Sequence, residues 1–349
     1  MKVCVIFGGI STEHDVSIVS ATSVIKNLDK EKYEILPIYI GKDGVWYKYT
    51  KEVEKIDNLT IGEKPKELEK IENIIGTLRE CDIIFPVLHG IGGEDGSIQG
   101  LFTLINKPYV GCGILASSVG MDKVYTKIIC EKANLNQAKY DYIRKAGKDY
   151  IYIDKNFNEE KCTLEEVCKK IEQHIGYPMF IKPSNSGSSV GINKAKNFEE
   201  LKRHIEYASR YDRKILVEQG IIGKEVECAV LGNEDVIASC VGEVLPADDF
   251  YSFDAKYNNS NSKTLIPAEI PDTISEEIRK LAIKAFKAID GRGLSRVDFF
   301  VENGTNKIYI NELNTLPGFT KISMYPKLFE QVGITYEKLL DKLIELSIN

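Results

Sequence analysis

Residues 296–318 read RVDFFVENGTNKIYINELNTLPG, and this stretch decides how the rest of the chain is interpreted. An Asn-Gly pair at 303–304 separates two strand-like runs, which is a strong signal for a β-hairpin. Side chains alternate between the two faces of a strand, so Arg296 and Asp298 share one face. Folding at the Asn-Gly turn brings Asp298 within one residue of Glu312. The sequence therefore predicts a hairpin that gathers charged side chains on one face.

The charged face of this hairpin offers hard oxygen ligands for a divalent cation. Asp298, Glu312 and Asn314 supply two carboxylates and an amide, and magnesium binds one or two carboxylates together with phosphate oxygens and water. The expected register places Asp298 opposite residue 311. A solvated polar face is the alternative, because most surface charges are solvated. A Pro-Gly turn at 317–318 brings bare backbone N–H groups close to a ligand, which favours the metal site.

A second polar loop indicates phosphate binding. Residues 182–191 read KPSNSGSSVG and follow an apolar strand-like run. Small residues let backbone amides wrap around phosphate oxygens, hydroxyl groups add donors, and Lys182 adds a positive charge. No Gly-Lys-Ser/Thr opens a helix here, so the loop is not a Walker A motif. A flexible linker is the alternative interpretation of this composition, although the loop is short and apolar strands flank it.

The order of the elements predicts an α/β unit followed by α+β units. The strands of the first unit are expected at 3–7, 34–40 and 82–88. The first helix is expected from about Thr12 to Leu28, with Ser11 as its N-cap. Strands that alternate with helices are typical of a mostly parallel sheet covered on both faces. The expected domains are 1–118 (N-terminal α/β), 119–213 (central α+β, with the phosphate loop) and 214–349 (C-terminal α+β, with the hairpin).

Composition narrows the class of protein. The 349 residues are 43% hydrophobic and 28% charged, as in an ordinary globular protein, and the net charge of −6 argues against nucleic acid as a main partner. No apolar run approaches the ~20 residues of a membrane span. The eight cysteines include no Cys-x-x-Cys pair and there are only four histidines, so a zinc site of closely spaced ligands is not expected. We expect a cytoplasmic protein in a reducing compartment.

Several motifs, in order along essentially the whole chain, resemble those of one family. They are the 8–17 run (GGISTEHDVS), the 88–96 run (LHGIGGEDG), the phosphate loop, Glu218 with Glu225, and the 311–320 run (NELNTLPGFT). Together they are similar to the D-alanine–D-alanine ligase family of the ATP-grasp superfamily. The resemblance implies a three-domain ATP-grasp ligase, in which an N-terminal parallel α/β domain binds the first D-alanine and two α+β domains clasp ATP.

The resemblance also implies a reaction. ATP would phosphorylate the carboxylate of one D-alanine, and the amine of a second would attack the acyl phosphate through a tetrahedral intermediate. The products would be ADP, phosphate and D-alanyl-D-alanine for peptidoglycan precursor synthesis. Two Mg²⁺ ions, or Mn²⁺, would bridge the phosphates. A free carboxylate is a poor electrophile, so such catalysis depends on activation, positioning and charge neutralisation. The family also implies a homodimer.

Individual residues take roles from the family positions that they match. Glu13 would bind the ammonium group of the first substrate near His89, and Ser188 would tie Glu13 to a lid. Arg296 and the Gly318 N–H would stabilise the oxyanion. The expected ATP-binding residues are Lys123, Lys182, Ser189, Glu218, Gln219, Ile221, Glu225 and Lys256. The expected metal ligands are Asp298, Glu312 and Asn314, and the second substrate would meet Ser323 and Met324. Helix capping, a structural histidine and a solvated lysine are the simpler explanations of Glu13, His89 and Lys123.

A long polar loop at 248–264 resembles the lid of this family. Lys256 would contact the transferred phosphate, and Tyr257 would join Glu13 and Ser188. Closure of a lid excludes water from a hydrolysable acyl phosphate. The alternative is an ordinary loop in which the aromatic residues pack locally, but loops of this length in compact domains are usually functional or disordered.

The expected second substrate is D-alanine. Relatives that make D-Ala–D-lactate replace the lid tyrosine, which is Tyr257 here. Relatives that make D-Ala–D-Ser tend to carry Arg where this chain has Met324, and an apolar side chain offers a serine hydroxyl no strong partner. The alternatives are a D-alanine–D-serine ligase and a non-catalytic nucleotide-binding relative. The intact set of matched residues argues against the non-catalytic relative.

Overall fold

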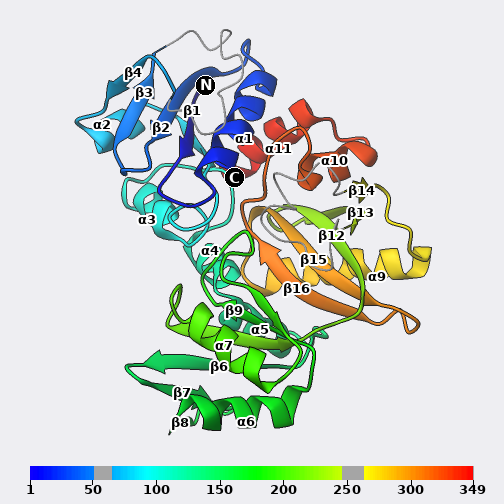
Figure 1. Cartoon of the computed structure of the whole chain (residues 1–349). Helices are drawn as coiled ribbons and strands as arrows, with labels where there is room; N and C mark the ends of the chain where they lie inside the picture. The colour runs from blue at the N-terminus through cyan, green and yellow to red at the C-terminus, as the bar shows by residue number, and fades with distance from the viewer. Residues whose placement is uncertain (51–64, 246–262, 349) are drawn as a thin grey trace.

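The structure is a computed structural model that describes residues 1–50, 65–245 and 263–348 (Figure 1). These residues form three β-sheets with helices packed against them. One sheet comes from the N-terminal part of the chain (blue to cyan), one from the central part (shades of green) and one from the C-terminal part (yellow-green to orange). The mixture of α/β and α+β units predicted from the sequence is confirmed. The limits of the three domains stay a prediction.

The N-terminal sheet is built around a buried apolar strand. Its strands, in order across the sheet, are β4 (Leu68–Lys70), β3 (Trp46–Tyr49), β2 (Glu34–Ile40), β1 (Lys2–Gly8) and β5 (Ile83–Val87). β1 runs parallel to both β2 and β5, as predicted. β3 and β4 extend one edge in antiparallel pairs. The sequence pattern does not predict these edge strands, because both are short and polar residues interrupt them.

The helices of this part connect its strands and lead into the next sheet. They are α1 (His14–Asn27), α2 (Ile74–Arg79) and α3 (Ser97–Leu104). The predicted start of the first helix is wrong, because α1 begins at His14 and its N-cap position is Glu13, not Ser11. Gly9 has a φ of 92°, so the chain turns sharply after β1. The Ser11 hydroxyl then accepts a hydrogen bond from the Glu13 N–H (3.1 Å) inside that turn. The turn carries Glu13 to the edge of the sheet.

The central sheet is antiparallel and carries the phosphate loop. Its strands, in order, are β10 (Asn193–Ala195), β9 (Met179–Pro183), β11 (Lys214–Gln219), β6 (Tyr140–Ala146), β7 (Asp149–Ile153) and β8 (Glu159–Cys162). The helices that precede and cover it are α4 (Ile114–Met121), α5 (Lys123–Lys132), α6 (Leu164–Ile175) and α7 (Phe198–Ala208). Apolar side chains of α6 and α7 form one buried cluster with the sheet. A capping box of Thr163 and Glu166 starts α6.

The C-terminal sheet has one apolar face and one charged face. Its strands, in order, are β14 (Lys263–Leu265), β13 (Ile237–Leu245), β12 (Gly223–Gly232), β15 (Gly293–Glu302) and β16 (Ile308–Asn314). Val297, Phe299 and Leu313 point to the apolar face, where they pack with helix α9 (Asp272–Ala288). Residues 263 and 264, expected in the long loop, are in β14. The rest of that loop, including Lys256 and Tyr257, lies outside the described residues.

Two helices close the described chain. They are α10 (Met324–Gln331) and α11 (Tyr336–Ile348), separated by a turn in which Gly333 has a φ of 88°. Figure 1 shows both beside α1 of the N-terminal sheet. Leu340 and Ile344 of α11 belong to the same buried cluster as Ile18 and Val24 of α1. The C-terminal helices therefore fasten the C-terminal sheet to the N-terminal one.

The predicted hairpin forms, but its register differs from the simple fold-over by one residue. Asp298 pairs directly with Glu312, not with Asn311, whereas the next pair is Phe299 with Ile310. One extra residue on β16 is thus accommodated in a β-bulge. The bulge turns the Glu312 side chain to the same face as Asp298. It is the local feature that brings the two carboxylates side by side.

None of the helices in the described ranges has the length and apolar character that a membrane crossing requires. All eight cysteines fall within these ranges and are free thiols, and seven of them are buried.

The apolar face of the hairpin should control the stability of its charged face. Leu313 is 3% exposed and lies between Glu312 and Asn314 in sequence, with its side chain packed toward α9. Leu313→Ala should lower the free energy of unfolding by about 2–5 kcal/mol, measured by urea denaturation. The control is Leu104→Ala on α3, because Leu104 is 85% exposed and its truncation should cost under about 0.5 kcal/mol. Equal losses in the two variants would contradict the assigned packing.

Candidate active site

The charged face of the C-terminal sheet carries three carboxylates at one level. Glu227 on β12 pairs with Asp298 on β15, and Asp298 pairs with Glu312 on β16. Directly paired residues point to the same face, so the three carboxylates form a line across three adjacent strands, here called the acidic row. Arg296 and Asn314 form the neighbouring pair on that face. Like charges in this arrangement repel each other unless a cation lies among them.

Arg296 is that cation, and it bridges two members of the acidic row. Its Nε and Nη2 donate to the two carboxylate oxygens of Asp298 at 2.7 and 2.6 Å. Its Nε also lies 3.1 Å from Oε2 of Glu227. Asp298 and Glu227 are 2% and 4% exposed, so both ion pairs are largely removed from water. Paired charges at this depth are strongly held, because either partner alone would be buried without compensation.

The donor set fits a divalent cation that is shared with phosphate oxygens. Asp298, Glu312 and Asn314 lie on one face, as predicted, and provide the hard oxygen atoms that Mg²⁺ prefers. Three carboxylates and one guanidinium leave the acidic row with excess negative charge. Within the part of the chain that the structure describes, no group of three or more His, Cys, Asp or Glu side chains is placed to hold a metal ion by itself. A ligand phosphate would have to complete the coordination.

A second charged cluster lies in the neighbouring sheet. Glu218 on β11 makes ion pairs with Lys182 on β9 and, at 2.8 Å, with Lys127 on α5. All three side chains are buried. Burial opposes the charge of Glu218, but the two lysines outweigh it and lower the pKa of Glu218 to about 2. Lys182 lies 3.5 Å from Oδ1 of Asn311, the bulge residue, so this cluster meets the acidic row where the two sheets touch.

Lys127 is a site residue that the sequence analysis misses. A lysine four residues after Lys123 on a helix has the pattern of an ordinary surface residue. The structure places it 2% exposed against Glu218. The signal that could have found it is its spacing, because α5 starts next to the phosphate loop and Lys127 is one turn further along the same face.

The predicted phosphate loop is an ordered turn. Ser188 and Ser189 have φ angles of 48° and 61°, and two left-handed residues in succession are unusual outside glycine. Ser186 donates to the carbonyl of Val190, which closes the loop on itself. Lys123, at the start of α5, donates from Nζ to the carbonyl of Ser186 at 2.6 Å. The loop is therefore an ordered turn that carries a lysine at its rim.

Glu13 and Ser188, which are 175 residues apart, meet in the structure. The Ser188 hydroxyl donates to Oε1 of Glu13. Two glycines pack closely against this carboxylate. A Cβ on Gly187 would lie 2.4 Å from Oε2 of Glu13, and a Cβ on Gly90 would lie 2.7 Å from the same atom. Glu13 is 7% exposed. The predicted link between the N-terminal part and the phosphate loop therefore forms, and only glycine fits beside it.

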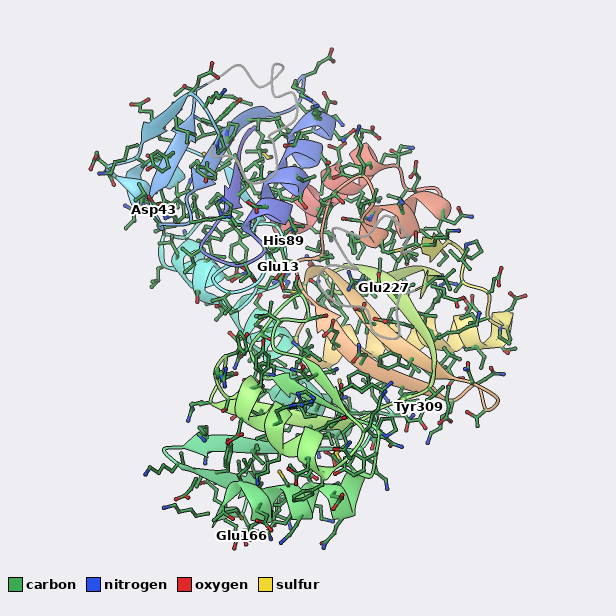
Figure 2. All side chains as sticks on the ribbon, in the orientation of Figure 1. Glu13, Asp43, His89, Glu166, Glu227 and Tyr309 are labelled. Carbon is green, nitrogen blue, oxygen red and sulfur yellow. The ribbon has the colours of Figure 1, made fainter. Side chains whose placement is uncertain are left out.

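His89 connects the N-terminal sheet with the loop after the hairpin. Its Nδ1 lies 3.1 Å from the carbonyl oxygen of Leu316, and its Nε2 lies 3.1 Å from the hydroxyl of Ser20 on α1. Burial alone would lower the pKa of His89, but the carboxylates of Glu94 and Glu13 and the Leu316 carbonyl outweigh it and raise the pKa. Figure 2 shows His89 beside Glu13 at the junction of the sheets. His89 thus orders the Pro-Gly turn next to the predicted first-substrate site.

The residues after the hairpin form a tight turn. The Ser323 hydroxyl accepts a hydrogen bond from the Thr320 N–H at 3.0 Å. A Cβ on Gly318 would come within 2.9 Å of the same hydroxyl, so the turn is closed around a glycine. Met324 is buried, and its methyl group fills the space beside Gly242 of β13. The structure thus places Ser323 and Met324 at the start of α10, next to the turn that carries Gly318.

The remaining predicted residues line the boundary between the two sheets or lie outside the described residues. Gln219 ends β11, and Ile221 lies in the connection to β12. Glu225 is on β12, close enough for its charge to raise the pKa of Lys182. Lys256 and Tyr257 belong to the undescribed ranges, so their predicted positions stay predictions.

Two family profiles match the chain. The profile described as D-ala D-ala ligase N-terminus matches residues 2–112, and the one described as D-ala D-ala ligase C-terminus matches residues 146–345. The chain belongs to the D-alanine–D-alanine ligase family. The predicted family is thereby confirmed, and the charged face of the hairpin lies within the C-terminal match.

Close relatives of the ligase family match the chain over nearly its full length. A D-alanine–D-alanine ligase of Clostridium acetobutylicum is 50% identical, covering 99% of this chain and 97% of the relative. One from Acetivibrio thermocellus is 48% identical, covering 99% and 96%. Among solved structures, VanG D-Ala:D-Ser ligase from Enterococcus faecalis has a TM-score of 0.85 at 37% identity, covering 99% of both chains. The D-alanine–D-alanine ligase of Coxiella burnetii has a TM-score of 0.82 at 32% identity, covering 100% and 95%.

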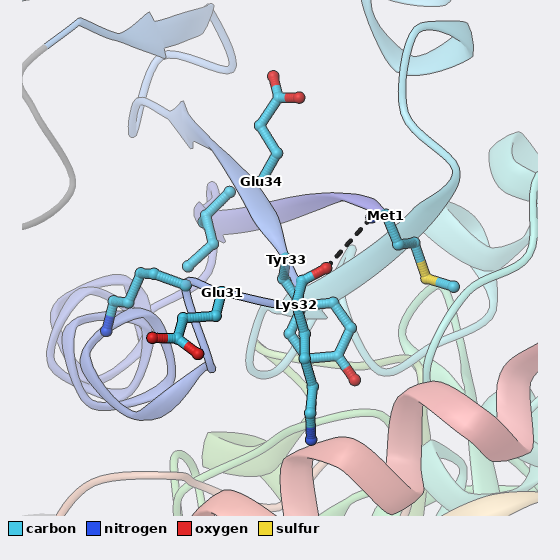
Figure 3. Close-up of a pocket in the computed structure, with 7 residues that line it drawn as sticks. Met1, Glu31, Lys32, Tyr33 and Glu34 are labelled. Carbon is cyan, nitrogen blue, oxygen red and sulfur yellow. Dashed lines mark hydrogen bonds between the residues drawn. The ribbon is translucent and has the colours of Figure 1, made fainter.

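A shallow hollow near the N-terminus lies apart from these ligase motifs (Figure 3). It is lined by Met1 and residues 30–35. The Met1 ammonium group donates to the carbonyl of Lys32 at 3.2 Å. The hollow lies at the turn between α1 and β2, where Lys32 and Tyr33 donate hydrogen bonds to Asp341 of α11. We assign this hollow to the packing of α11 and not to the chemistry.

The Glu218 cluster predicts a specific dependence of stability on pH. A carboxylate with a pKa lowered from 4.5 to about 2 stabilises the fold above pH 4.5 and loses that stabilisation as the pH falls toward 2. Glu218→Gln should therefore flatten the fall in thermal midpoint between pH 6 and about 3, measured by circular dichroism. The control Glu165→Gln removes an exposed helical ion pair with Lys169 and should follow the wild-type profile. Identical slopes for Glu218→Gln and wild type would contradict the assigned ion pairs.

Proposed function

We propose that the chain joins two D-alanine molecules to form D-alanyl-D-alanine, with conversion of ATP to ADP and phosphate, for peptidoglycan precursor synthesis. One observation carries the proposal. The phosphate loop joins the parts that such a reaction needs, because Ser188 at its tip bonds Glu13 while Lys182 at its base reaches Asn311 beside the acidic row. The relatives at about half identity that are named D-alanine–D-alanine ligases support the same activity.

Glu13 is suited to receive the ammonium group of the first D-alanine. Its carboxylate is held by Ser188 and walled by two glycines, so its orientation is fixed before a substrate arrives. It also stands at the N-terminus of α1, where the helix dipole favours a negative charge. The ordered turn that His89 ties down lies against the same site. With its ammonium group bound to Glu13, the first D-alanine would direct its carboxylate toward the phosphate loop.

The lysines of the phosphate loop and the acidic row have complementary tasks. Lys123 and Lys182 would neutralise the phosphates of ATP, with Ser189 adding donors from the loop. Mg²⁺ or Mn²⁺ ions held by Asp298, Glu312 and Asn314 would supply the divalent charge that balances the transferred phosphate. Lys127 does not need to leave Glu218 when Lys182 turns to the phosphates. The Glu218 carboxylate therefore keeps one counter-ion. Glu218, Gln219, Ile221 and Glu225 would bind the nucleoside.

Amide formation then requires stabilisation of a tetrahedral oxyanion. Arg296 and the backbone N–H of Gly318 would supply a charged and a neutral donor to that oxygen. Lys256 and Tyr257 of the lid would close the site against water. The surroundings of Met324 are apolar, and its side chain is 7% exposed, which suits the methyl group of a second D-alanine. We further propose a cytoplasmic location, in keeping with the free thiols; the homodimer stays a prediction.

The similarity to a D-Ala:D-Ser ligase structure gives a second candidate function. An apolar pocket rejects an added hydroxyl group only weakly, so Met324 does not by itself exclude D-serine. The two candidates differ in the second substrate alone. Both need ATP, the acidic row and Glu13.

Phosphate release and product mass spectrometry test the proposal. With ATP and Mg²⁺, D-alanine alone should give phosphate and D-alanyl-D-alanine, and addition of D-serine or D-lactate should add little mixed product. Faster formation of the D-serine product would favour the second candidate, and no turnover with any substrate would contradict both.

Asp298→Ala should lower kcat at least about 100-fold, because it removes a proposed metal ligand. The control Asp149→Ala, which removes an exposed pair with Lys161 on the central sheet, should retain activity.

The glycine wall beside Glu13 gives a second test. Gly187→Ala places a Cβ 2.4 Å from Oε2 of Glu13, so the carboxylate must move from the position in which it accepts the hydrogen bond of Ser188. We expect KM for D-alanine to rise about tenfold or more, with KM for ATP nearly unchanged. Gly100→Ala on α3 is the matched control, because nothing lies within 4 Å of its added Cβ. A KM for ATP that rises as much as KM for D-alanine would contradict the placement of Glu13 at the amino-acid site.

A further inference from the structure

Arg296 has two buried counter-ions, and only one of them belongs to the metal set. Its guanidinium takes both oxygens of Asp298, at 2.7 and 2.6 Å, and lies 3.1 Å from Glu227. Glu227 is on β12, on the opposite side of β15 from Glu312. Figure 2 shows Glu227 on the C-terminal sheet. None of the roles described so far uses this residue.

A metal ion at Asp298 would share that carboxylate with Arg296. A carboxylate has about four lone-pair positions, and a guanidinium bound to both oxygens takes the two that face outward together. A cation on the remaining positions would draw negative charge from the same two oxygens, so it would compete with Arg296 for Asp298. A guanidinium released at this depth with no other partner would be a buried, uncompensated charge, which is strongly unfavourable.

We propose that Glu227 is a positioning residue that holds Arg296 when Asp298 turns to the metal. This inference rests on the proposed function, in which Asp298 binds the cation and Arg296 meets the oxyanion. In the structure, Arg296 is shared between Asp298 and Glu227. When the cation takes Asp298, Glu227 becomes the main counter-ion. The guanidinium then stays in the plane of the acidic row with donors left for the reacting oxygen.

The surroundings of Glu227 suit a fixed anchor better than a ligand. Its neighbour on the far side is Gly242 of β13, and the space above that glycine is filled by Met324. The residue paired with Arg296 across the strands is Ala229, whose small side chain leaves room for the guanidinium to reach Glu227. Glu227 is thus enclosed by the sheet and by α10, and it forms an ion pair with Arg296 at 3.1 Å. Its distance of two strands from Glu312 sets it apart from the expected metal ligands.

A double-mutant cycle on metal binding tests this role without turnover. Mn²⁺ binding to the full chain, in the presence of a non-hydrolysable ATP analogue, is measured by the loss of the free Mn²⁺ signal in electron paramagnetic resonance. Glu227→Gln should weaken Mn²⁺ binding about tenfold, because Arg296 then has only Asp298 and competes harder with the metal. In the Arg296→Gln background the competitor is absent, so Glu227→Gln should change Mn²⁺ binding less than about twofold. If Arg296→Gln does not fold, Arg296→Lys replaces it, because a single ammonium cannot pair with both oxygens of Asp298 as the guanidinium does.

The control variant for this experiment comes from the same sheet. Glu243→Gln removes another buried carboxylate of this sheet, one that pairs with Lys224 at 2.9 Å, and should leave Mn²⁺ binding and turnover as in wild type. An unchanged Mn²⁺ affinity in Glu227→Gln would overturn the proposal. An equal loss in both Arg296 backgrounds would overturn it too, because Glu227 would then act on the metal directly. Absence of ligase turnover in wild type would instead overturn the proposed function, independently of the Mn²⁺ cycle.

Discussion

Mutual repulsion among Glu227, Asp298 and Glu312 is the constraint around which the site is organised. Three carboxylates at one level of a sheet cannot coexist without cations, and water cannot supply the screening because Glu227 and Asp298 are buried. Arg296 meets part of that need. Under the proposed function, the remaining negative charge would be balanced by a divalent ion such as Mg²⁺ together with bound phosphate. The opposite, apolar face packs against α9 and supplies the stability that lets the strands tolerate this arrangement.

The central sheet carries the opposite imbalance. Two lysines surround Glu218, so this cluster has an excess of positive charge where the acidic row has an excess of negative charge. The two clusters approach each other at Lys182 and Asn311. ATP with divalent ions contains both signs, phosphate and metal, and can satisfy both clusters together. Under the proposed function, one charged partner in each cluster would face the ligand while another, Lys127 or Glu227, would stay with the protein. Neither Glu218 nor Arg296 would then be left without a counter-ion.

Much of the fold follows from local pattern, and the parts that do not follow have identifiable reasons. The Asn-Gly turn and alternating side chains predict the hairpin, and the hairpin forms. The Ser/Gly composition predicts a phosphate loop; the loop is an ordered turn, and its binding of phosphate stays a prediction. The exact pairing of Asp298 with Glu312 is not predictable, because a β-bulge is set by packing and not by the turn. Lys127 has the spacing of a surface lysine. Its burial depends on Glu218 of β11, a strand that begins 82 residues after the end of α5 (from 132 to 214), and no local pattern reports that contact. Family resemblance supplied the contact of Glu13 with Ser188, which no local pattern indicates.

The central claim is that the acidic row and the phosphate loop hold one nucleotide and its metal between them. A crystal structure of the full chain with ADP and Mn²⁺, with anomalous scattering recorded at the manganese edge, tests it most directly. The account predicts manganese within about 2.0–2.3 Å of carboxylate oxygens of Asp298 and Glu312, on the side that faces Lys182. It also predicts that Arg296 will have turned from Asp298 toward Glu227. Manganese bound elsewhere, or an Arg296 that keeps both bonds to Asp298 beside a bound ion, would contradict the account.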